Sequence, residues 1–368
     1  MLIGIDASRA VVHPRTGTEG YSYHLIRGLL SLESPHRYVL YFNSPPADDD
    51  FPPGAAKLRT MPFPRLWTHL RLSAEMLVRP PDLLFVPAHV LPAVHPRHSV
   101  VTVHDLGYLH WPAAHPWTRW WHLHLSTLYN ARAATLVLAD SAATRDDLAM
   151  RYGIPREKVR VVHLGCSPEF RPPSEGAVAA IRRRYAIDGD YVLAVGTIQP
   201  RKNLVRLVEA FDLARAALPR RTRLVLAGRA GWGAGEVYRR AGPLGDAVRF
   251  LGYVPESDLP ALIGGASVLA FPSLYEGFGL PALEAMACGT PVVAADSSSL
   301  PEVVGGAGIL VPPTDVPALA RALTSVLLDA DLRAELRRRG LERARQFSWR
   351  RCAEETLHVL EEAASSPA

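Results

Sequence analysis

The chain has few cysteines and no long apolar run. Its three cysteines, Cys166, Cys288 and Cys352, form no CxxC pair, so neither a disulfide framework nor a zinc site is expected and a reducing cytoplasm fits. No uninterrupted apolar stretch of about 18 residues occurs, which predicts that no helix spans a membrane. The segment Met1 to Ser8 leads directly into a strand-like pattern without a signal-peptide core. We therefore expect a cytoplasmic protein that at most lies peripherally on the inner face of a membrane.

Lysine is also scarce, since 38 of the 41 basic residues are arginine. The net charge is +5 and the sequence pI about 9.2. Residues 1–165 carry 17 Lys and Arg against 13 Asp and Glu, together with thirteen of the fourteen histidines. A basic first half could meet an anionic acceptor or an anionic membrane. A solvated arginine-rich surface explains the same composition, and both interpretations stay open.

Length and hydrophobic pattern predict two α/β domains. With 368 residues, 48% of them hydrophobic, the chain suits two domains of roughly 170 residues with a cleft between them. Strand-like and helix-like runs alternate in both halves, which predicts parallel doubly wound sheets. Strands are expected at 2–6, 38–42, 83–86, 100–103, 135–139, 191–195, 223–227, 248–251, 266–271 and 292–295. Helices are expected at 21–32, 65–78, 117–133, 142–152, 204–217, 237–241, 259–264, 279–288 and 349–364.

Two carboxylates flank one predicted helix start. Residues 276–284 have the sequence Glu-Gly-Phe-Gly-Leu-Pro-Ala-Leu-Glu and are followed by Ala-Met-Ala-Cys-Gly-Thr-Pro. The N–H groups of Phe278, Gly279 and Leu280 fall in the first helical turn, where unpaired donors and the helix dipole favour an anion. Glu276 precedes the helix and Glu284 lies about 12 Å further along its axis. One acid could therefore reach a sugar and the other a ribose, with a diphosphate between them.

Two adjacent cations follow another predicted strand. Arg201 and Lys202 lie in the segment from Gly196 to Asn203, between strand 191–195 and the next helix. The carboxyl end of a parallel strand is where α/β proteins bind ligands. Arginine can clamp phosphate oxygens through two N–H groups and lysine adds a point charge. This pair is expected to neutralise a departing diphosphate.

Together these segments resemble the Glu-x7-Glu and Gly-x4-Arg-Lys-Asn patterns of retaining glycosyltransferases of glycosyltransferase family 4 (glycosyl transferases group 1). The resemblance implies the α/β GT-B fold, two doubly wound Rossmann-like domains facing across a cleft. It implies that Glu276 contacts the transferred sugar and Glu284 the ribose of the nucleotide. Many members carry an arginine directly after the glycine where this chain has Thr197, so Arg201 and Lys202 would carry the charge.

The same resemblance implies the domain limits. Residues 161–173 contain Gly165 and several prolines and indicate a linker, similar to an element that the family has at this place. The last helix of this fold commonly returns to the first domain. We therefore expect an acceptor-side domain at 1–168 with helix 349–368 packing back on it, and a nucleotide-sugar-binding domain at 169–348.

Further segments resemble other parts of the family's site. His104, at the end of strand 100–103, would lie near the transferred sugar, while Asp105 is expected to support the turn. Gly17, in the loop that begins at Thr16, resembles an acceptor-side glycine loop, and its spacing does not match GxGxxG. Asp140-Ser141 resembles a helix start, with a capping role.

Two turns of the second half bear on the nucleotide. Gly228 ends the strand 223–227. Tyr253 and Val254 resemble the family's base-binding turn, in which main-chain groups contact the base. Because backbone atoms would make these contacts, the side chains do not identify the base.

Four of the seven tryptophans lie between Trp111 and Trp121, interleaved with basic residues. The segment comprises Trp111, Trp117, Arg119, Trp120, Trp121, His122 and His124. Aromatic and basic residues together suit a membrane interface or a platform for sugar or lipid. Core packing of a helix is the alternative, and the sequence does not rank the two.

The expected activity is metal-independent retaining transfer of a sugar from a nucleotide diphosphate to a glycan or polyprenyl-linked acceptor. No Asp-x-Asp follows an apolar strand, because residues 48–50 lie in a polar loop and 188–190 precede a strand, so a GT-A metal site is not expected. The segment Gly-Thr-x-x-Pro-Arg-Lys-Asn is similar to that of mannosyltransferase-like members, which makes GDP-mannose the first donor to test among GDP- and UDP-sugars. No cofactor and no nucleic acid partner is expected. The alternatives are a nucleotide-sugar epimerase or a phosphorylase on this fold, or a non-catalytic nucleotide-sugar or lipid-surface binding protein.

Overall fold

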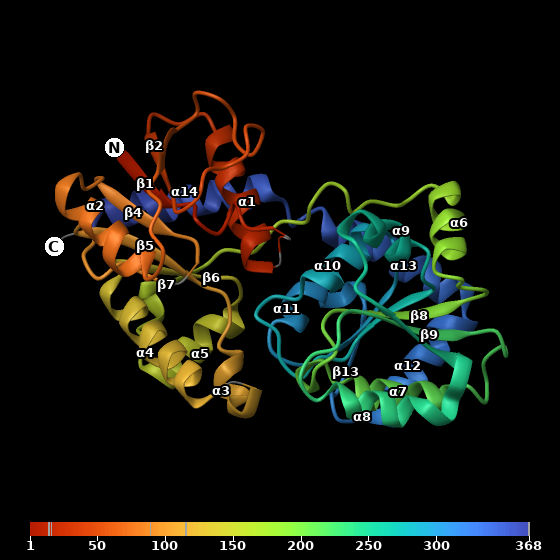
Figure 1. Ribbon diagram of the computed structural model, residues 1–368. Helices are drawn as coiled ribbons and strands as arrows, with labels where there is room; N and C mark the ends of the chain where they lie inside the picture. The colour runs from red at the N-terminus through yellow and green to blue at the C-terminus, as the bar shows by residue number, and fades with distance from the viewer. Residues whose placement is uncertain (14, 16, 89, 115, 367–368) are drawn as a thin grey trace. The chain divides into compact units, whose positions relative to one another are not determined.

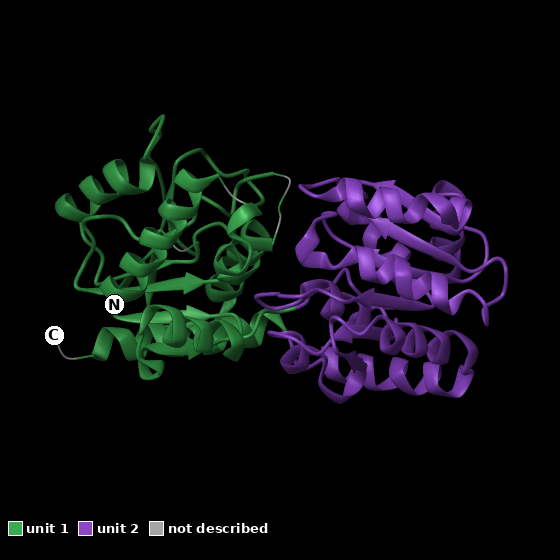
Figure 2. Ribbon diagram, turned by 90° about the horizontal axis from the view of Figure 1, so that it is seen from below, with its two compact units in different colours: residues 1–165, 348–368 green, residues 166–347 purple. Residues whose placement is uncertain are grey.

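The chain forms two compact units, each with its own parallel sheet (Figure 2). The computed structural model describes residues 1–13, 15, 17–88, 90–114 and 116–366. Unit 1 comprises Met1–Gly165 and the segment from Ser348 onward, and unit 2 comprises Cys166–Phe347. The chain therefore enters unit 2 three residues before the predicted limit at 168 and leaves it one residue before the predicted limit at 348.

Unit 1 is built on a seven-stranded parallel sheet with the order β3-β2-β1-β4-β5-β6-β7 (Figure 1). The strands are β1 (Leu2–Asp6), β2 (Arg37–Phe42), β3 (Lys57–Thr60), β4 (Leu83–Val86), β5 (His98–Val103), β6 (Leu136–Ala139) and β7 (Val159–Val161). The helices are α1 (Gly17–Ser31), the π-helix η1 (Thr68–Leu72), α2 (Ser73–Val78), α3 (Gly107–His110), η2 (Pro112–Ala114), α4 (Trp117–Ala133), α5 (Ala142–Tyr152), η3 (Arg156–Lys158) and α14 (Trp349–Ser365). Central strands such as β4 are buried on both faces and therefore consist of an unbroken apolar run.

The two faces of this sheet are covered by different helices. α1 and α14 pack against each other, and α14 contacts β4, β5 and β6. Ser348 caps α14 by accepting a hydrogen bond from the Arg351 N–H at 3.2 Å. On the other face, Leu72 and Met76 share one apolar cluster with Ala131 of α4 and Leu148 of α5. The segments that contain α2, α4 and α5 therefore cover the same face.

Unit 2 is built on a six-stranded parallel sheet with the order β10-β9-β8-β11-β12-β13. The strands are β8 (Tyr191–Val195), β9 (Arg223–Ala227), β10 (Val248–Gly252), β11 (Val268–Phe271), β12 (Val292–Ala295) and β13 (Ile309–Val311). The helices are α6 (Glu175–Arg184), η4 (Pro200–Lys202), α7 (Leu204–Ala214), α8 (Ala234–Ala241), η5 (Gly242–Ala247), η6 (Glu256–Asp258), α9 (Leu259–Gly264), α10 (Leu280–Ala287), α11 (Leu300–Val304), η7 (Gly305–Ala307), α12 (Val316–Leu328) and α13 (Ala330–Ala344). The strand order reverses direction between β8 and β11, which is the switch point where open α/β sheets bind ligands.

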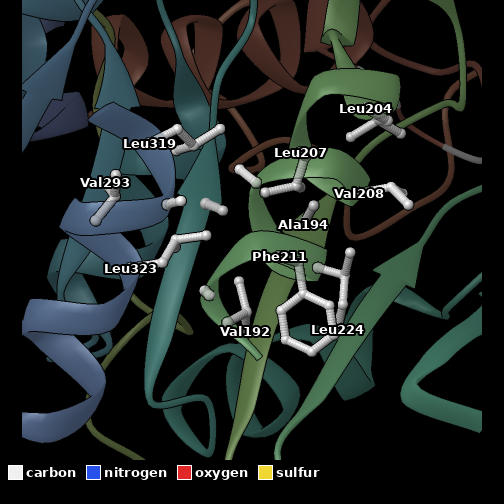
Figure 3. Packing of buried hydrophobic residues seen from close by; sticks show 14 of the residues in the cluster. Val192, Ala194, Leu204, Leu207, Val208, Phe211, Leu224, Val293, Leu319 and Leu323 are labelled. Carbon is white, nitrogen blue, oxygen red and sulfur yellow. The ribbon is translucent and has the colours of Figure 1, made fainter. Parts of the chain in front are cut away.

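The core of unit 2 fixes the start of α7 over β8. Leu204, Leu207, Val208 and Phe211 recur at helical spacing and are buried. Figure 3 shows these side chains with Val192 and Ala194 of β8 and Leu224 of β9. Because the first turn of α7 is anchored in this way, the residues just before it are held at the carboxyl end of β8.

None of the helices in the described part of the chain combines the length and the apolar character needed to cross a bilayer.

Candidate active site

The loops that follow β8 and β11 are tied together at the switch point. Asn203, which has a left-handed backbone (φ 58°), donates from its amide nitrogen to the carbonyls of Pro272 at 3.0 Å and Pro313 at 2.6 Å. The Leu274 N–H donates to the Arg201 carbonyl at 2.9 Å. Asn203 belongs to the Arg-Lys-Asn motif, but the sequence does not predict that its side chain connects the loops that contain Pro272 and Pro313. The result is that two segments more than seventy residues apart form one surface.

Glu276 bridges the two predicted phosphate-binding cations. One carboxylate oxygen accepts from Lys202 Nζ at 2.7 Å and the other from Arg201 at 2.7 Å. Arg201 also donates to the Tyr275 carbonyl at 2.7 Å. The Glu276 and Lys202 side chains are only 9% and 11% exposed, so water screens this pair weakly. The structure thus joins the acid and both cations in one cluster.

The backbone around Glu276 is held as firmly as its side chain. Its N–H donates to the Ser298 hydroxyl at 2.9 Å, and its carbonyl accepts from the Ser299 hydroxyl at 2.9 Å. Burial alone would raise the pKa of Glu276, but Lys202 and Arg201 outweigh it and hold the pKa below its usual value. Glu276 is therefore a fixed carboxylate that stays ionised. The serines at 298 and 299 were not foreseen, and their only signal is a Ser-Ser-Ser run after β12.

α10 begins where the sequence predicts an anion site, one residue later than expected. Gly279 is its N-cap residue with φ 110°, and a Cβ there would lie 2.7 Å from Leu300, so only glycine fits this turn. In the described structure the N–H groups of Gly279 and Leu280 donate to no protein acceptor. The Phe278 side chain is buried, and its ring centre lies 5.9 Å from that of Phe347. The ring therefore belongs to the core and not to the predicted anion site.

Glu284 lies on α10 and has an unusual acidity. The pKa of Glu284 is raised to about 7, first by burial and then by the nearby Glu256 carboxylate, while Lys202 opposes both. Among the described residues, no side chain or backbone group donates a hydrogen bond to this carboxylate. A carboxyl without protein donors and with a pKa near neutrality is a candidate for contact with a ligand.

Gly228 is required by backbone packing. A Cβ on Gly228 would lie 1.9 Å from the Gly196 carbonyl oxygen, far inside any real contact. The loops after β8 and β9 can approach only because Gly228 has no side chain. The sequence analysis assigned Gly228 to nucleotide binding. The structure gives a different reason for a glycine at this position, which is the close approach of the Gly196 backbone.

Gly228→Ala should consequently distort the loop that carries Arg201. Because the obstructing atom is backbone and not the end of a flexible side chain, we expect unfolding free energy to fall by about 3 kcal/mol. Thermal or urea unfolding measures this loss. Gly235→Ala is the matched control, since a Cβ there meets nothing within 4 Å. Equal stability of the two variants would contradict the packing argument.

The predicted base-binding turn lies beside an exposed arginine–aromatic pair. Tyr253 is half-exposed and Val254 is buried. The Arg229 guanidinium lies 4.4 Å from the centre of the Tyr253 ring, a cation–π distance. The turn follows β10 and belongs to unit 2, as do the residues of the ion-pair cluster.

His104 and Gly17 belong to unit 1. His104 is bonded within that unit through both ring nitrogens, Nδ1 with Asp140 at 2.8 Å and Nε2 with the Pro87 carbonyl at 2.9 Å. Because a carbonyl only accepts, Nε2 carries hydrogen. Burial lowers the pKa of His104, but Asp140 outweighs burial and the pKa is raised. His104 is therefore arranged as a hydrogen-bond donor and not as a base.

The remaining predictions for unit 1 concern turns. Gly17 is the first residue of α1 and a Cβ there would meet nothing within 4 Å, whereas Thr16 lies outside the described residues. Asp105 accepts from the Gly107 N–H at 2.8 Å, and Ser141 caps α5 by accepting from the Thr144 N–H at 3.2 Å. Both predicted turn and cap roles are confirmed. In the described part of the chain, no three His, Cys, Asp or Glu side chains gather as a metal-ligand group.

Two protein families and several known proteins match this chain. The family Glycosyltransferase Family 4 matches residues 15–170, and Glycosyl transferases group 1 matches residues 179–343. O-antigen chain mannosyltransferase B of Escherichia coli is 35% identical over 266 residues, which cover 72% of this chain and 70% of that protein. The chain belongs to glycosyltransferase family 4. The family resemblance predicted from the motifs is thereby confirmed.

A second relative and a solved structure bear on the length and the fold of this family 4 glycosyltransferase. The serotype-specific mannosyltransferase WbdA of Escherichia coli is 30% identical over 232 residues, 61% of this chain but 28% of that protein. The structure of HepE from Anabaena in complex with UDP and glucose superposes with a TM-score of 0.75 at 22% identity, covering 98% of this chain and 99% of that one. At that identity the likeness establishes the fold, so the predicted GT-B class of two Rossmann-like domains is confirmed.

Proposed function

We propose that this glycosyltransferase moves mannose from GDP-mannose, with retention and without a metal ion, to a lipid-linked glycan acceptor in cell-surface polysaccharide synthesis. The observation that carries the proposal is the cluster of Glu276, Arg201 and Lys202 at the switch point, with Glu284 on the adjoining helix. Two cations and two carboxylates at one strand edge suit a nucleotide diphosphate sugar. The two mannosyltransferase relatives support mannose as the sugar and a surface polysaccharide as the acceptor class.

Each residue has a separate task in this proposal. Arg201, Lys202 and the N–H groups at the start of α10 receive the diphosphate and stabilise its charge as it leaves. Glu284 accepts hydrogen bonds from the ribose hydroxyls. Glu276 holds both cations and orients the hydroxyls of the sugar. Tyr253 and Val254 contact the base through backbone groups, and His104, held by Asp140 and the Pro87 carbonyl, lies near the transferred sugar.

The transfer step proceeds on one face of the sugar. The acceptor oxygen bonds to the anomeric carbon on the face from which the β-phosphate oxygen leaves. The departing phosphate oxygen takes the hydroxyl proton, so the products are the glycoside and a nucleoside diphosphate. No carboxylate attacks, because Glu276 is already engaged by two cations.

The donor is tested by offering several nucleotide sugars in the presence of EDTA. Because the protein supplies the cations for the diphosphate, we expect binding without added metal. Among GDP-mannose, UDP-glucose, UDP-N-acetylglucosamine and dTDP-rhamnose, GDP-mannose should raise the melting temperature most and release its nucleoside diphosphate fastest. Nucleotide release and thermal shift are measured together. A strict requirement for Mg²⁺ or Mn²⁺ would contradict metal independence. Preference for a UDP-sugar would contradict the donor, and binding without turnover would favour the non-catalytic alternative.

A further inference from the structure

One face of α4 exposes aromatic and apolar side chains to solvent. Trp117, Trp121, Leu125 and Tyr129 follow one another at intervals of four residues and are 63%, 42%, 56% and 42% exposed. Residues four apart lie on the same side of a helix. A soluble helix ordinarily buries such a stripe and presents polar groups outward. α4 therefore presents an apolar face that the unit itself does not cover.

The core-facing side of α4 has its own aromatic residues, so the exposed stripe is not needed to attach the helix. Trp120 donates from its indole N–H to the Tyr108 carbonyl at 3.0 Å and stacks on His124 with ring centres 5.0 Å apart. Tyr152 of α5 completes this contact through a 2.9 Å hydrogen bond with His124. The tryptophan segment thus divides: Trp120 packs in the core, and Trp117 and Trp121 do not.

A second exposed apolar segment lies on η1 and α2. Leu77 and Val78 are 69% and 73% exposed, and Leu66 and Leu70 are more than half exposed. These four side chains lie within thirteen residues. Trp67 and Met76 of the same segment point into the core shared with α4. The two exposed segments are therefore carried by elements that pack on one side of the same sheet.

Contacts connect the two segments through the loop after β4. The Tyr129 hydroxyl donates to the Ala93 carbonyl at 3.4 Å. The next residue, Val94, is itself exposed and donates its N–H to the Ser73 hydroxyl at the start of α2 at 3.3 Å. The exposed Val94 therefore lies between α4 and the start of α2, and we call the exposed apolar residues of α4, Val94 and the segment 66–78 the apolar band. Exposed apolar residues gathered in this way mark an interaction site.

Basic residues predominate on the two exposed segments. α4 contains no acidic residue, and its exposed face carries Arg119, His122 and Arg132. On the second segment the acid is Glu75, which is buried and paired with Arg59 and Arg71. A band of tryptophan and leucine rimmed by arginine is complementary to anionic lipid headgroups over an apolar layer.

We propose that unit 1 docks on anionic bilayers through this band, with Trp117 and Trp121 on α4 and Leu77 and Val78 on α2 entering the headgroup region. The proposal is independent of the donor and of the chemistry assigned to unit 2. An enzyme held in this way would meet an acceptor that is itself anchored in a bilayer.

Vesicle flotation of the whole protein tests the surface. Trp117→Ala with Trp121→Ala should lower affinity for vesicles of phosphatidylcholine and phosphatidylglycerol by at least about tenfold. Arg119→Gln with Arg132→Gln should lower it about fivefold per arginine on those vesicles and leave pure phosphatidylcholine unaffected. Leu77→Ser with Val78→Ser tests the other segment without touching α4. Trp232→Ala in unit 2, at a tryptophan 39% exposed, is the matched control and should float like the parent.

Each result decides the proposal. Unchanged flotation of the α4 and α2 variants, or equal binding to vesicles with and without phosphatidylglycerol, would overturn it. So would concentration-dependent dimerisation in sedimentation experiments that disappears in the tryptophan variant, since a second copy of the chain would then be the occupant. The thermal shift caused by GDP is measured for every variant and reports whether the fold and the nucleotide site are intact. If the α4 variant unfolds, the α2 variant still tests the proposal.

Discussion

Glu276→Gln is expected to slow turnover about ten- to a hundredfold while tightening the binding of GDP. The neutral amide loses a hydrogen bond to a charged group or sugar hydroxyl in the transition state, worth roughly 1.5 to 3 kcal/mol. At the same time Arg201 and Lys202 lose the carboxylate that now neutralises them. A diphosphate entering beside them would no longer be repelled by that charge, so we expect about tenfold tighter binding. Initial rates and calorimetric titration measure the two effects.

The ion pairs of Glu276 with Arg201 and Lys202 also contribute to the stability of the fold. The control variant must therefore separate a loss of stability from a loss of activity. Removing one partner of a nearly buried pair leaves two cations without their counterion, which destabilises the fold by about 3 kcal/mol. Glu209→Gln is the matched variant, because Glu209 pairs with Arg240 at 3.1 Å outside the site. It should leave turnover and GDP affinity unchanged. If Glu276→Gln turned over donor at the parental rate while folded, Glu276 would have no part in the chemistry.

Glu284→Gln is expected to stabilise the protein at pH 8 and to weaken nucleotide binding. The pKa of Glu284 is raised from 4.5 to about 7 on folding, first by burial. A carboxyl with a raised pKa stabilises the fold below pH 4.5, and this contribution is lost as the pH rises through about 7. Glutamine mimics the protonated form, so the variant should gain about 2 to 3 kcal/mol at pH 8 and nothing at pH 4. Urea unfolding at both pH values measures the difference.

The same acidity makes nucleotide affinity depend on pH. Ribose hydroxyls donate to the carboxylate, so GDP should bind more weakly as the pH falls below about 7, and binding should release protons near that pH. Glu284→Gln removes this dependence and leaves only the titration of the ligand's own phosphate. Glu256→Gln is the second comparison, because loss of its charge lowers the pKa of Glu284 toward its usual value. Parallel pH profiles for the parent and Glu284→Gln would be inconsistent with contact between Glu284 and the nucleotide.

Much of the fold was predictable from local pattern. Strands β1, β4, β8, β9 and β12 and helices α4, α5 and α9 have the bounds that apolar periodicity predicts. α10 and β11 are shorter than predicted, because Gly279 caps the helix and Val268 begins the strand pairing. β3 was missed, since it is a largely exposed edge strand without an apolar run. β7 has only three residues and was not predicted, and neither were α6, α12 and α13.

The site was predictable in its members but not in its connections. Two carboxylates at Glu-x7-Glu spacing and the Arg-Lys pair are visible in the sequence. That Glu276 neutralises Arg201 and Lys202 is not, because 74 residues separate Lys202 from Glu276 and only the order of the sheet places β8 beside β11. Likewise the pKa of Glu284 is raised first by burial and then by Glu256 of η6, and the sequence reveals neither cause.

Titration of GDP into the parent protein, Glu276→Gln and Glu284→Gln at pH 8 in EDTA tests the central claim most directly. The claim is that both acids and both cations form one nucleotide-diphosphate site in which the two acids act in opposite directions. The account predicts that affinity rises about tenfold in Glu276→Gln and falls about ten- to a hundredfold in Glu284→Gln. Shifts of the same sign in both variants, or no shift in either, would contradict it.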